Sequence, residues 1–301
     1  MKIFYTVWLF DKHFKHIHIM KTSLLILINV LFFYAFASGQ IQPTKRPTEE
    51  IINSAVLLKH SAGTGSGIII SNDTALYLVT ARHVLLKEIN KNHQFKDSNI
   101  EVTSFQSNSD SNMVFIMKIN LIKALEAQNL RFYTDKDLVS IKIGTLKKDV
   151  IFYKPFVSIL KGNNALNTYP LKEENYLLMK QTKILTDIII VGFPTSLGYG
   201  NQFDFFTPIT RKGSIAGKNL TKKTIVLDCP VFPGNSGGPV FALDSTSPIL
   251  QIIGIVTEFI PLADTWQSSQ FEGLSHVFLE NSGYAVVEPW DYVMSLIKLM
   301  N

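Results

Sequence analysis

The chain has 301 residues, of which 46% are hydrophobic and 18% are charged, so it carries ample material for a globular core. Its formal net charge of +5 is modest, and its lysines form no basic stripe interleaved with aromatic residues. This pattern argues against a nucleic-acid-binding surface. The single cysteine, Cys229, excludes an intrachain disulfide, and no zinc-ligand spacing occurs.

The first 39 residues have the pattern of a targeting segment. Lys21 precedes an apolar run at residues 23–36, and small residues follow at 37–39, which is typical of a secretory signal. We predict cleavage near Gln40, with Met20 as an alternative initiator. The rival is a retained membrane anchor, although the run is shorter than the ~20 residues of a spanning helix. Either alternative predicts export, to the periplasm or the medium, and residues 40–50 then form a polar linker.

Short β-branched and aromatic runs separated by turn residues predict an all-β fold beyond the linker. One such strand covers residues 76–80, and His83 follows it at the start of a turn. There, packing can fix a histidine while one ring edge faces a cleft. We therefore select His83 as a candidate general base, with His276 as the alternative. The sequence places His60 at a strand end and His93 in a polar loop.

A candidate partner for this histidine opens the next clear strand. Asp137 is the first residue of a run at residues 137–143 that alternates apolar and other residues. A carboxylate at the head of such a strand can lie at the edge of a core, against an imidazole. Asp135, in the polar turn at residues 134–136, is the competing carboxylate.

The most specific motif is Gly-Asn-Ser-Gly-Gly-Pro at residues 234–239, between apolar runs at 225–227 and 240–242. Glycines around a serine allow a tight turn that exposes the hydroxyl and aims backbone N–H groups at an oxyanion. The motif predicts Ser236 as a nucleophile, with the N–H groups of Gly234 and Ser236 as the oxyanion hole. A plain surface turn is the alternative, and the flanking strands make it less favourable.

In the order His83, Asp137, Ser236, these residues resemble the catalytic triad of the trypsin/chymotrypsin superfamily. Further segments resemble its HtrA-like (Deg) branch, and in chain order they cover residues 65–69, 80–84, 188–194, 213–217, 254–257 and 283–290. The resemblance spans about residues 50–300. It implies two six-stranded β-barrel lobes with a short C-terminal helix, and a serine endopeptidase that needs no cofactor and no metal.

By this resemblance, residues 51–301 form one protease domain. Its expected parts are a first lobe at about 51–150, a crossover at 151–180, a second lobe at 181–287 and a terminal helix at 289–300. Because the base and acid lie on one lobe and the nucleophile on the other, the site is expected in the cleft between them.

The resemblance also implies substrate-binding residues. Thr257, Glu258 and Phe259 would form the edge strand that pairs with the substrate backbone, and the Thr257 hydroxyl would support the buried aspartate. Pro230 would lie near the pocket floor. With no acidic residue there and Phe259 narrowing the mouth, small or medium apolar side chains are the expected preference. Asn235 replaces the aspartate that captures a new N-terminus in digestive proteases, so activation by cleavage is not expected.

The sequence therefore predicts an exported serine endopeptidase that acts on peptides or unfolded proteins. It would contact a membrane only if the N-terminal segment is retained. The alternative is a catalytically silent protease-like domain that binds peptides or a protein partner. An esterase is less favoured, because on an α/β sheet the nucleophile would precede the histidine in the chain.

Overall fold

The computed structural model describes most of the chain after residue 52. The described residues are 53–89, 92–108, 111–146, 149–162, 166–195, 207–243, 249–267, 270 and 273–300. The predicted targeting segment and the linker at residues 40–50 lie outside this set. All the described residues belong to one compact unit. Within the described part, no helix is long and apolar enough to span a membrane.

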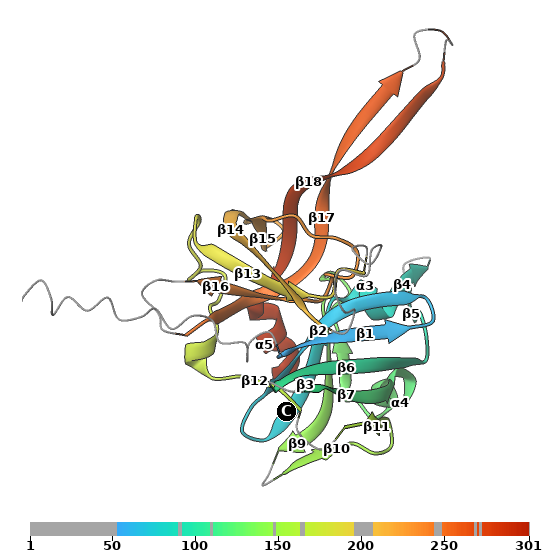
Figure 1. Cartoon of the computed structure of the whole chain (residues 1–301), viewed down its shortest axis with the longest axis vertical. Helices are drawn as coiled ribbons and strands as arrows, with labels where there is room; N and C mark the ends of the chain where they lie inside the picture. Colours follow the sequence, from blue (N-terminus) through green and yellow to red (C-terminus); the bar gives the residue numbers. More distant parts are fainter. Residues whose placement is uncertain are drawn as a thin grey trace, which may run out of the picture. The chain divides into compact units, whose positions relative to one another are not determined.

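The first lobe is a ten-stranded, mostly antiparallel sheet in the order β10-β9-β3-β2-β1-β6-β7-β11 (Figure 1). Off this path, β8 (Leu130–Phe132) pairs with β9, and β12 (Tyr169–Pro170) pairs in parallel with β2. The strands of the path are β1 (Ala55–His60), β2 (Gly63–Ser71), β3 (Ala75–Thr80), β6 (Asn99–Asn108), β7 (Ser111–Asn120), β9 (Val139–Leu146), β10 (Val150–Phe152) and β11 (Val157–Lys161).

Shorter elements lie between these strands. A separate hairpin pairs β4 with β5. Two short helices and a 3-10 turn also lie between strands in the chain. The bounds of the hairpin strands and of these elements are β4 (Leu86–Ile89), β5 (Asn92–Phe95), α3 (Arg82–Leu85), α4 (Leu121–Glu126) and η1 (Glu173–Asn175).

The second lobe is a closed barrel with the strand order β13-β14-β15-β18-β17-β16. Its strands are β13 (Asp187–Gly192), β14 (Ile209–Asn219), β15 (Thr224–Asp228), β16 (Pro239–Leu243), β17 (Gln251–Gln267) and β18 (Ser275–Pro289). The all-β, two-lobed fold predicted from the sequence is confirmed. The six-stranded barrel describes the second lobe, whereas the first lobe is a sheet of ten strands, and two of these, β11 and β12, come from the expected crossover segment.

Strand β3 shows why parts of the sequence lack the alternation of a half-buried strand. All six of its residues are buried. Leu76 and Leu78 pack in the core of the first lobe, whereas Tyr77 and Val79 face a second core that includes residues of the barrel and of the final helix. Because both faces of the strand are covered, the sequence is a continuous apolar run.

The final helix, α5 (Trp290–Lys298), packs into the core that the two lobes share. Trp290, Val293, Leu296 and Ile297 are buried at helical spacing. They belong to the same cluster as Ile68 of the first lobe and Phe241 of the barrel. The predicted terminal helix is therefore present, and it holds the lobes together in addition to covering the barrel.

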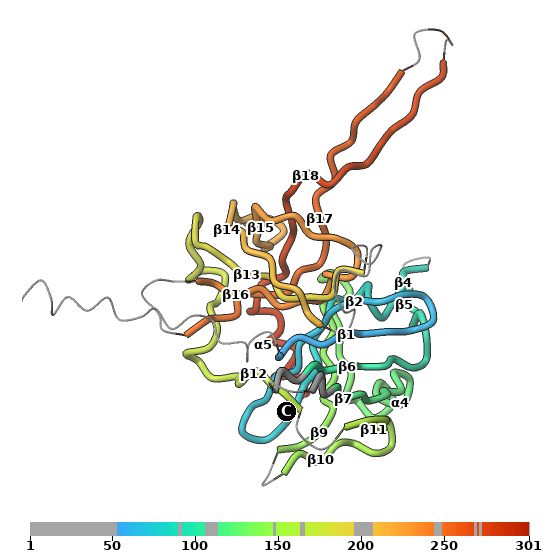
Figure 2. Tube along the Cα trace, viewed as in Figure 1, coloured from blue at the N-terminus to red at the C-terminus, as the bar shows by residue number. Residues whose placement is uncertain are grey.

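The two longest strands extend well beyond the barrel. Figures 1 and 2 show the outer parts of β17 and β18 leaving the barrel side by side as a two-stranded ribbon. Pairing continues outward to Gln267↔Ser275. Strand β15 pairs with β18 only at residues 284–287, so the barrel ends where the ribbon begins.

Tyr169 provides a test of the junction between the lobes. Its hydroxyl lies 2.8 Å from the Asn175 carbonyl and 2.5 Å from the Leu250 carbonyl, and burial raises its pKa. Tyr169→Phe should cost about 1–3 kcal/mol, which lowers the melting temperature by about 2–4 °C per kcal/mol. Thermal denaturation measures this effect. The exposed Tyr284→Phe is the control, and equal melting temperatures for the two variants would contradict the assignment.

Candidate active site

His83 lies on the short turn that follows β3. Val84 and Leu85 are buried in the core of the first lobe and fix the single turn of α3. The His83 side chain points outward and is 46% exposed. Packing therefore holds the backbone in place while the imidazole stays accessible.

Asp137 holds this histidine at two points. One carboxylate oxygen accepts the His83 backbone N–H at 2.8 Å, and the other lies 2.5 Å from the ring Nδ1. Because an ionised carboxylate only accepts hydrogen bonds, Nδ1 carries the proton and Nε2 has a lone pair. Asp137 is 25% exposed, less buried than a carboxylate within a core, because it lies in the loop before β9.

The alternative residues lie in other environments. Asp135 is exposed in the preceding turn. The His60 ring accepts the Ala62 N–H at 3.1 Å, and burial lowers its pKa. His93 packs edge-on against Phe132 in the β4–β5 hairpin region, and His276 stacks on Phe278 in the outer ribbon. Only His83 pairs with a carboxylate among the described histidines.

The loop that carries Ser236 requires glycine at two positions. Gly234 and Gly237 have φ angles of +99° and +87°. A Cβ atom at Gly234 would lie 2.2 Å from the Phe193 carbonyl oxygen, and one at Gly237 would lie 2.0 Å from the Ser66 oxygen. Backbone bonds from Gly237 N–H to the Val256 carbonyl (2.7 Å) and from Val256 N–H to Gly238 (2.9 Å) fix the turn.

The two predicted oxyanion donors lie in this turn, where Gly234 is buried and Ser236 is partly buried. The backbone N–H groups of Gly234 and Ser236 have no hydrogen-bond acceptor among the described residues. Asn235 N–H, by contrast, bonds to the Phe232 carbonyl at 2.9 Å. The turn therefore leaves the N–H groups on either side of Asn235 without an acceptor in the described chain, and a substrate oxygen could accept hydrogen bonds from both.

The Ser236 hydroxyl donates to the Thr257 carbonyl at 3.1 Å. No hydrogen bond joins it to His83 in the part of the chain that the structure describes. The resemblance implies that the Thr257 hydroxyl supports Asp137, but in the structure that hydroxyl donates to the Val286 carbonyl at 3.3 Å. Another side chain, Glu288, lies against Asp137 and accepts its backbone N–H at 3.4 Å.

Ser66, a residue that the sequence reasoning did not select, connects the two halves of the site. It lies on β2 and is fully buried. Its N–H donates to the Ser236 carbonyl at 2.8 Å, and its hydroxyl donates to the Gly234 carbonyl at 2.7 Å. The same hydroxyl accepts the Phe193 N–H at 2.9 Å. A small polar residue between two glycines in an apolar strand was the available signal.

The carbonyl of Ser66 extends this connection toward His83. It accepts the Thr80 hydroxyl at 2.6 Å, and Thr80 ends the strand that leads into α3. A Cβ atom at Gly65 would lie 2.6 Å from the Val84 side chain, so β2 packs directly on α3. Strand β2 therefore lies between the turn with His83 and the loop with Ser236, and it brings the two into one region.

Glu288 places a second carboxylate beside Asp137. It is 6% exposed, and no hydrogen-bond donor reaches its Oε2 atom among the described residues. Burial raises the Glu288 pKa, Lys136 at 3.9 Å from Oε2 opposes this shift, and the charge of Asp137 adds to it. The site therefore contains a carboxyl group with a raised pKa next to the histidine's partner.

Of the predicted pocket residues, Thr257, Glu258 and Phe259 lie on β17, and Pro230 lies in the segment after β15. Glu258 is exposed, while Pro230 and Phe259 are half-buried, and Phe259 packs on the barrel core. Cys229 is buried, and burial raises its pKa to about 11, which suits packing as a small hydrophobe.

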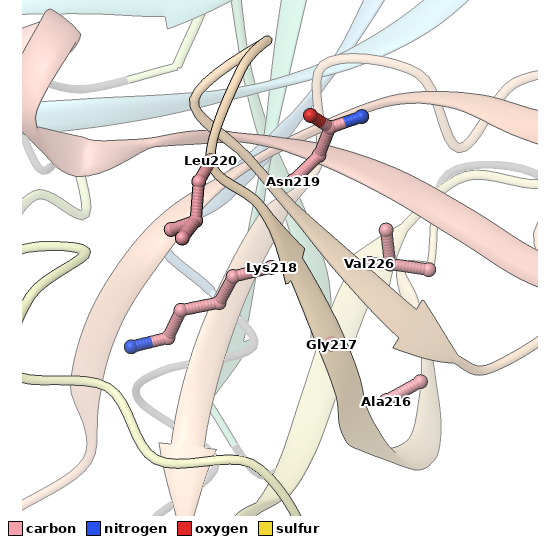
Figure 3. A pocket seen from close by; sticks show the side chains of 6 residues that line it. All are labelled: Ala216, Gly217, Lys218, Asn219, Leu220 and Val226. Carbon is pink, nitrogen blue, oxygen red and sulfur yellow. The ribbon is translucent and has the colours of Figure 1, made fainter.

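A separate hollow of about 470 Å³ lies on β14 and β15 (Figure 3). No predicted site residue lines it. Its one charged side chain, Lys218, donates to the Met179 carbonyl at 2.8 Å and to the Thr182 carbonyl at 2.5 Å. In the described residues, no group of three or more His, Cys, Asp or Glu side chains is arranged to hold a metal ion.

Residues 65–247 match the trypsin-like peptidase domain. No curated protein matches the chain. Similar solved structures include the serine endoprotease from Yersinia pestis, at 18% identity over 84% of this chain and 67% of that chain, with a TM-score of 0.43.

Two further solved structures are similar at comparable levels. The HtrA-type protease AlgW with a tripeptide has 16% identity over 82% of this chain and 60% of that chain, with a TM-score of 0.46. The Rv3671c protease of M. tuberculosis, in an inactive form, has 15% identity over 86% of this chain and 93% of that chain, with a TM-score of 0.43.

Two β lobes that meet at a glycine-bounded serine turn are the arrangement expected of a trypsin-like peptidase domain. The domain match covers more than half of the sequence, and the chain belongs to the trypsin-like peptidase family. This confirms the resemblance drawn from its motifs.

The Ser66 connection predicts a coupled loss of stability and reactivity. Ser66→Ala removes the donor to Gly234 and the acceptor of the Phe193 N–H, and should cost about 1–3 kcal/mol of stability. It should also slow labelling of Ser236 by a fluorophosphonate, because the loop loses its support from β2. Ser158→Ala, on the exposed face of β11, is the matched control. Unchanged labelling by a less stable Ser66→Ala protein would limit Ser66 to a folding role.

Glu288 predicts a pH dependence of stability. Because the pKa of Glu288 is raised in the folded protein, the folded state holds this proton at pH values where the unfolded state has lost it. The free energy of unfolding therefore falls as the pH rises from 4.5, the ordinary pKa of a glutamate, through the raised pKa. Glu288→Gln cannot ionise and should be more stable than the native protein at neutral pH. The difference in stability between Glu288→Gln and the native protein should shrink below pH 4.5. Melting temperatures from pH 4 to pH 8 measure this, with exposed Glu258→Gln as control, and a pH-independent difference would contradict it.

Proposed function

We propose that the chain is an exported serine endopeptidase that hydrolyses peptide bonds through an acyl-enzyme on Ser236. The observation that carries the proposal is the double contact of Asp137 with His83, to Nδ1 at 2.5 Å and to the backbone N–H at 2.8 Å. It leaves Nε2 as the basic atom of an accessible imidazole. A nucleophile needs such a base within reach.

The proposed reaction uses groups already in the site. The Ser236 hydroxyl turns from the Thr257 carbonyl toward His83, which takes its proton as the oxygen attacks the substrate carbonyl. The N–H groups of Gly234 and Ser236 stabilise the oxyanion. Asp137 stabilises the imidazolium, His83 then protonates the leaving amine, and water repeats the sequence to release the acid.

The proposed substrates are peptides or unfolded proteins that pair with Thr257, Glu258 and Phe259 in extended conformation. A small or medium apolar side chain would precede the scissile bond, near Pro230 and Phe259. Export to the periplasm or the medium rests on the apolar run at residues 23–36. Contact with a membrane would require that segment to be retained.

A second candidate function is a silent peptide-binding domain. It is favoured by the hydroxyl of Ser236, which donates to the Thr257 carbonyl at 3.1 Å and makes no hydrogen bond to His83 within the described chain. Catalytic hydrogen bonds in ligand-free structures often form only when substrate binds. The endopeptidase therefore remains the preferred proposal.

A fluorophosphonate probe separates the two candidates. The native protein should be labelled on Ser236 with one probe per chain, and Ser236→Ala should not be labelled. His83→Ala should lose several orders of magnitude in labelling rate, and Asp137→Asn about 10⁴-fold. Mass spectrometry gives the site and a time course gives the rate. A folded protein that takes up no probe, yet binds peptides, would establish the silent domain instead.

A further inference from the structure

The outer β17–β18 ribbon is an exposed apolar surface. Every described residue at 260–267 and 275–281 is exposed. Five large apolar side chains are at least half exposed, namely Leu262, Trp266, Val277, Phe278 and Leu279. An isolated two-stranded ribbon is marginally stable in water, and a contiguous exposed apolar patch marks a site of interaction. The ribbon therefore has the properties of a surface that binds a partner.

One edge of this ribbon is continuous with the proposed active site. Strand β16 pairs with β17 only as far as Pro239↔Ile255. From Thr257 to Gln267 that edge of β17 has no strand partner among the described residues. The edge begins at the Thr257 carbonyl, to which Ser236 donates its hydroxyl hydrogen. A peptide paired at Thr257 therefore meets an open strand edge that continues outward along β17.

The direction of the edge determines which part of a peptide lies on it. A peptide antiparallel to β17, with its scissile bond at Ser236, places the residues before that bond alongside increasing β17 numbers. Residues 261–267 add a strand of about 23 Å at ~3.3 Å per residue. That length suits about seven peptide residues beyond those paired with Thr257 to Phe259.

The backbone of the ribbon fits an open edge. Pro261 has no N–H group, and proline in a strand is confined to edges and bulges. Register shifts occur at Val256/Glu258 and at Phe259/Pro261, so the edge bends at both points. The first shift leaves Thr257 as the extra residue of a bulge, with its carbonyl toward Ser236. A bound peptide would therefore pair in an inner and an outer segment, with one hydrogen bond missing opposite Pro261.

The ribbon's side chains indicate the chemistry of the peptide. By register, Leu262 and Trp266 share one face with Phe278, while Val277 and Leu279 lie on the other. An added strand would alternate its side chains between these two apolar faces. The stretches 257–267 and 275–281 carry three carboxylates, on Glu258, Asp264 and Glu280, and no lysine or arginine. The surface therefore favours apolar and basic side chains over acidic ones.

We propose that the outer edge of β17 is an extended binding site for the part of the polypeptide substrate that precedes the scissile bond. The bound segment adds as a strand and carries apolar or basic side chains. This inference rests on the proposed function for its direction. It predicts a preference for long unfolded segments over short peptides.

Binding to Ser236→Ala tests the site without requiring turnover. The probes are a peptide with three residues before the scissile position and one with about ten, both apolar and without Asp or Glu. The long peptide should bind about tenfold or more tightly, because several backbone hydrogen bonds at roughly threefold to tenfold each are added. Replacing residues 261–281 by a two-residue Asn-Gly turn should reduce its affinity to that of the short peptide. Short-peptide affinity and melting temperature report whether the shortened protein folds.

A backbone scan of the long peptide tests the pairing on the protein with an intact ribbon. In an antiparallel pair, only every second peptide N–H points at the neighbouring strand. N-methylation at alternate outer positions should weaken binding roughly threefold to tenfold, and methylation at the positions between them should not. Acidic residues at the outer positions should also weaken binding.

Equal affinities of the long and short peptides for the intact ribbon would overturn the inference. So would a ribbon deletion that changes the oligomeric state or the binding of phosphatidylcholine vesicles while leaving long-peptide affinity unchanged, since the ribbon would then bind a second copy or a lipid surface. If fluorophosphonate labelling fails but the peptide results hold, the binding edge stands and the proposed hydrolysis does not.

Discussion

The hydrogen bonds of Ser66 are the constraint on which the rest of the site depends. A buried strand of the first lobe holds the Ser236 loop through two bonds, 2.8 Å to the Ser236 carbonyl and 2.7 Å to the Gly234 carbonyl. Because buried polar groups without partners are costly, these bonds fix the loop relative to β2. Gly237 permits that approach, since a Cβ atom there would lie 2.0 Å from the Ser66 oxygen. The same strand packs on the turn with His83, so one element positions both halves of the site.

The two halves of the site, His83 with Asp137 and the loop with Ser236, differ in how closely their hydrogen bonds match those that the proposed reaction needs. Asp137 orients His83 at two points, so the imidazole is already held in one tautomer. Ser236 instead donates to the Thr257 carbonyl, a group on the edge where a substrate would pair. A substrate N–H that binds this carbonyl would compete with the serine hydroxyl for it. Substrate pairing would thereby favour rotation of the hydroxyl toward the base, which links binding along β17 to the chemistry at Ser236.

The sequence predicts the parts of the site whose chemistry is local. The serine turn needs its glycines for backbone reasons, and His83 follows a run rich in strand-forming residues, so both stand out in the sequence alone. Ser66 and Glu288 were missed because their partners lie far along the chain: Ser66 bonds to Gly234, 168 residues away, and Glu288 to Asp137, 151 residues away. The outer ribbon was missed for another reason. Its exposed leucines and Trp266 have the same composition as core strands, and composition alone does not reveal exposure.

The central claim is that folding gathers His83 and Ser236 into one reacting pair. A peptidyl chloromethyl ketone tests it directly, because the serine must first hold the carbonyl of the inhibitor next to the imidazole that its chloromethyl carbon alkylates. Mass spectrometry of the treated protein should find alkylation at His83 and not at His60, His93 or His276, and none in Ser236→Ala. Alkylation spread over exposed histidines, or persisting at His83 without Ser236, would contradict the account.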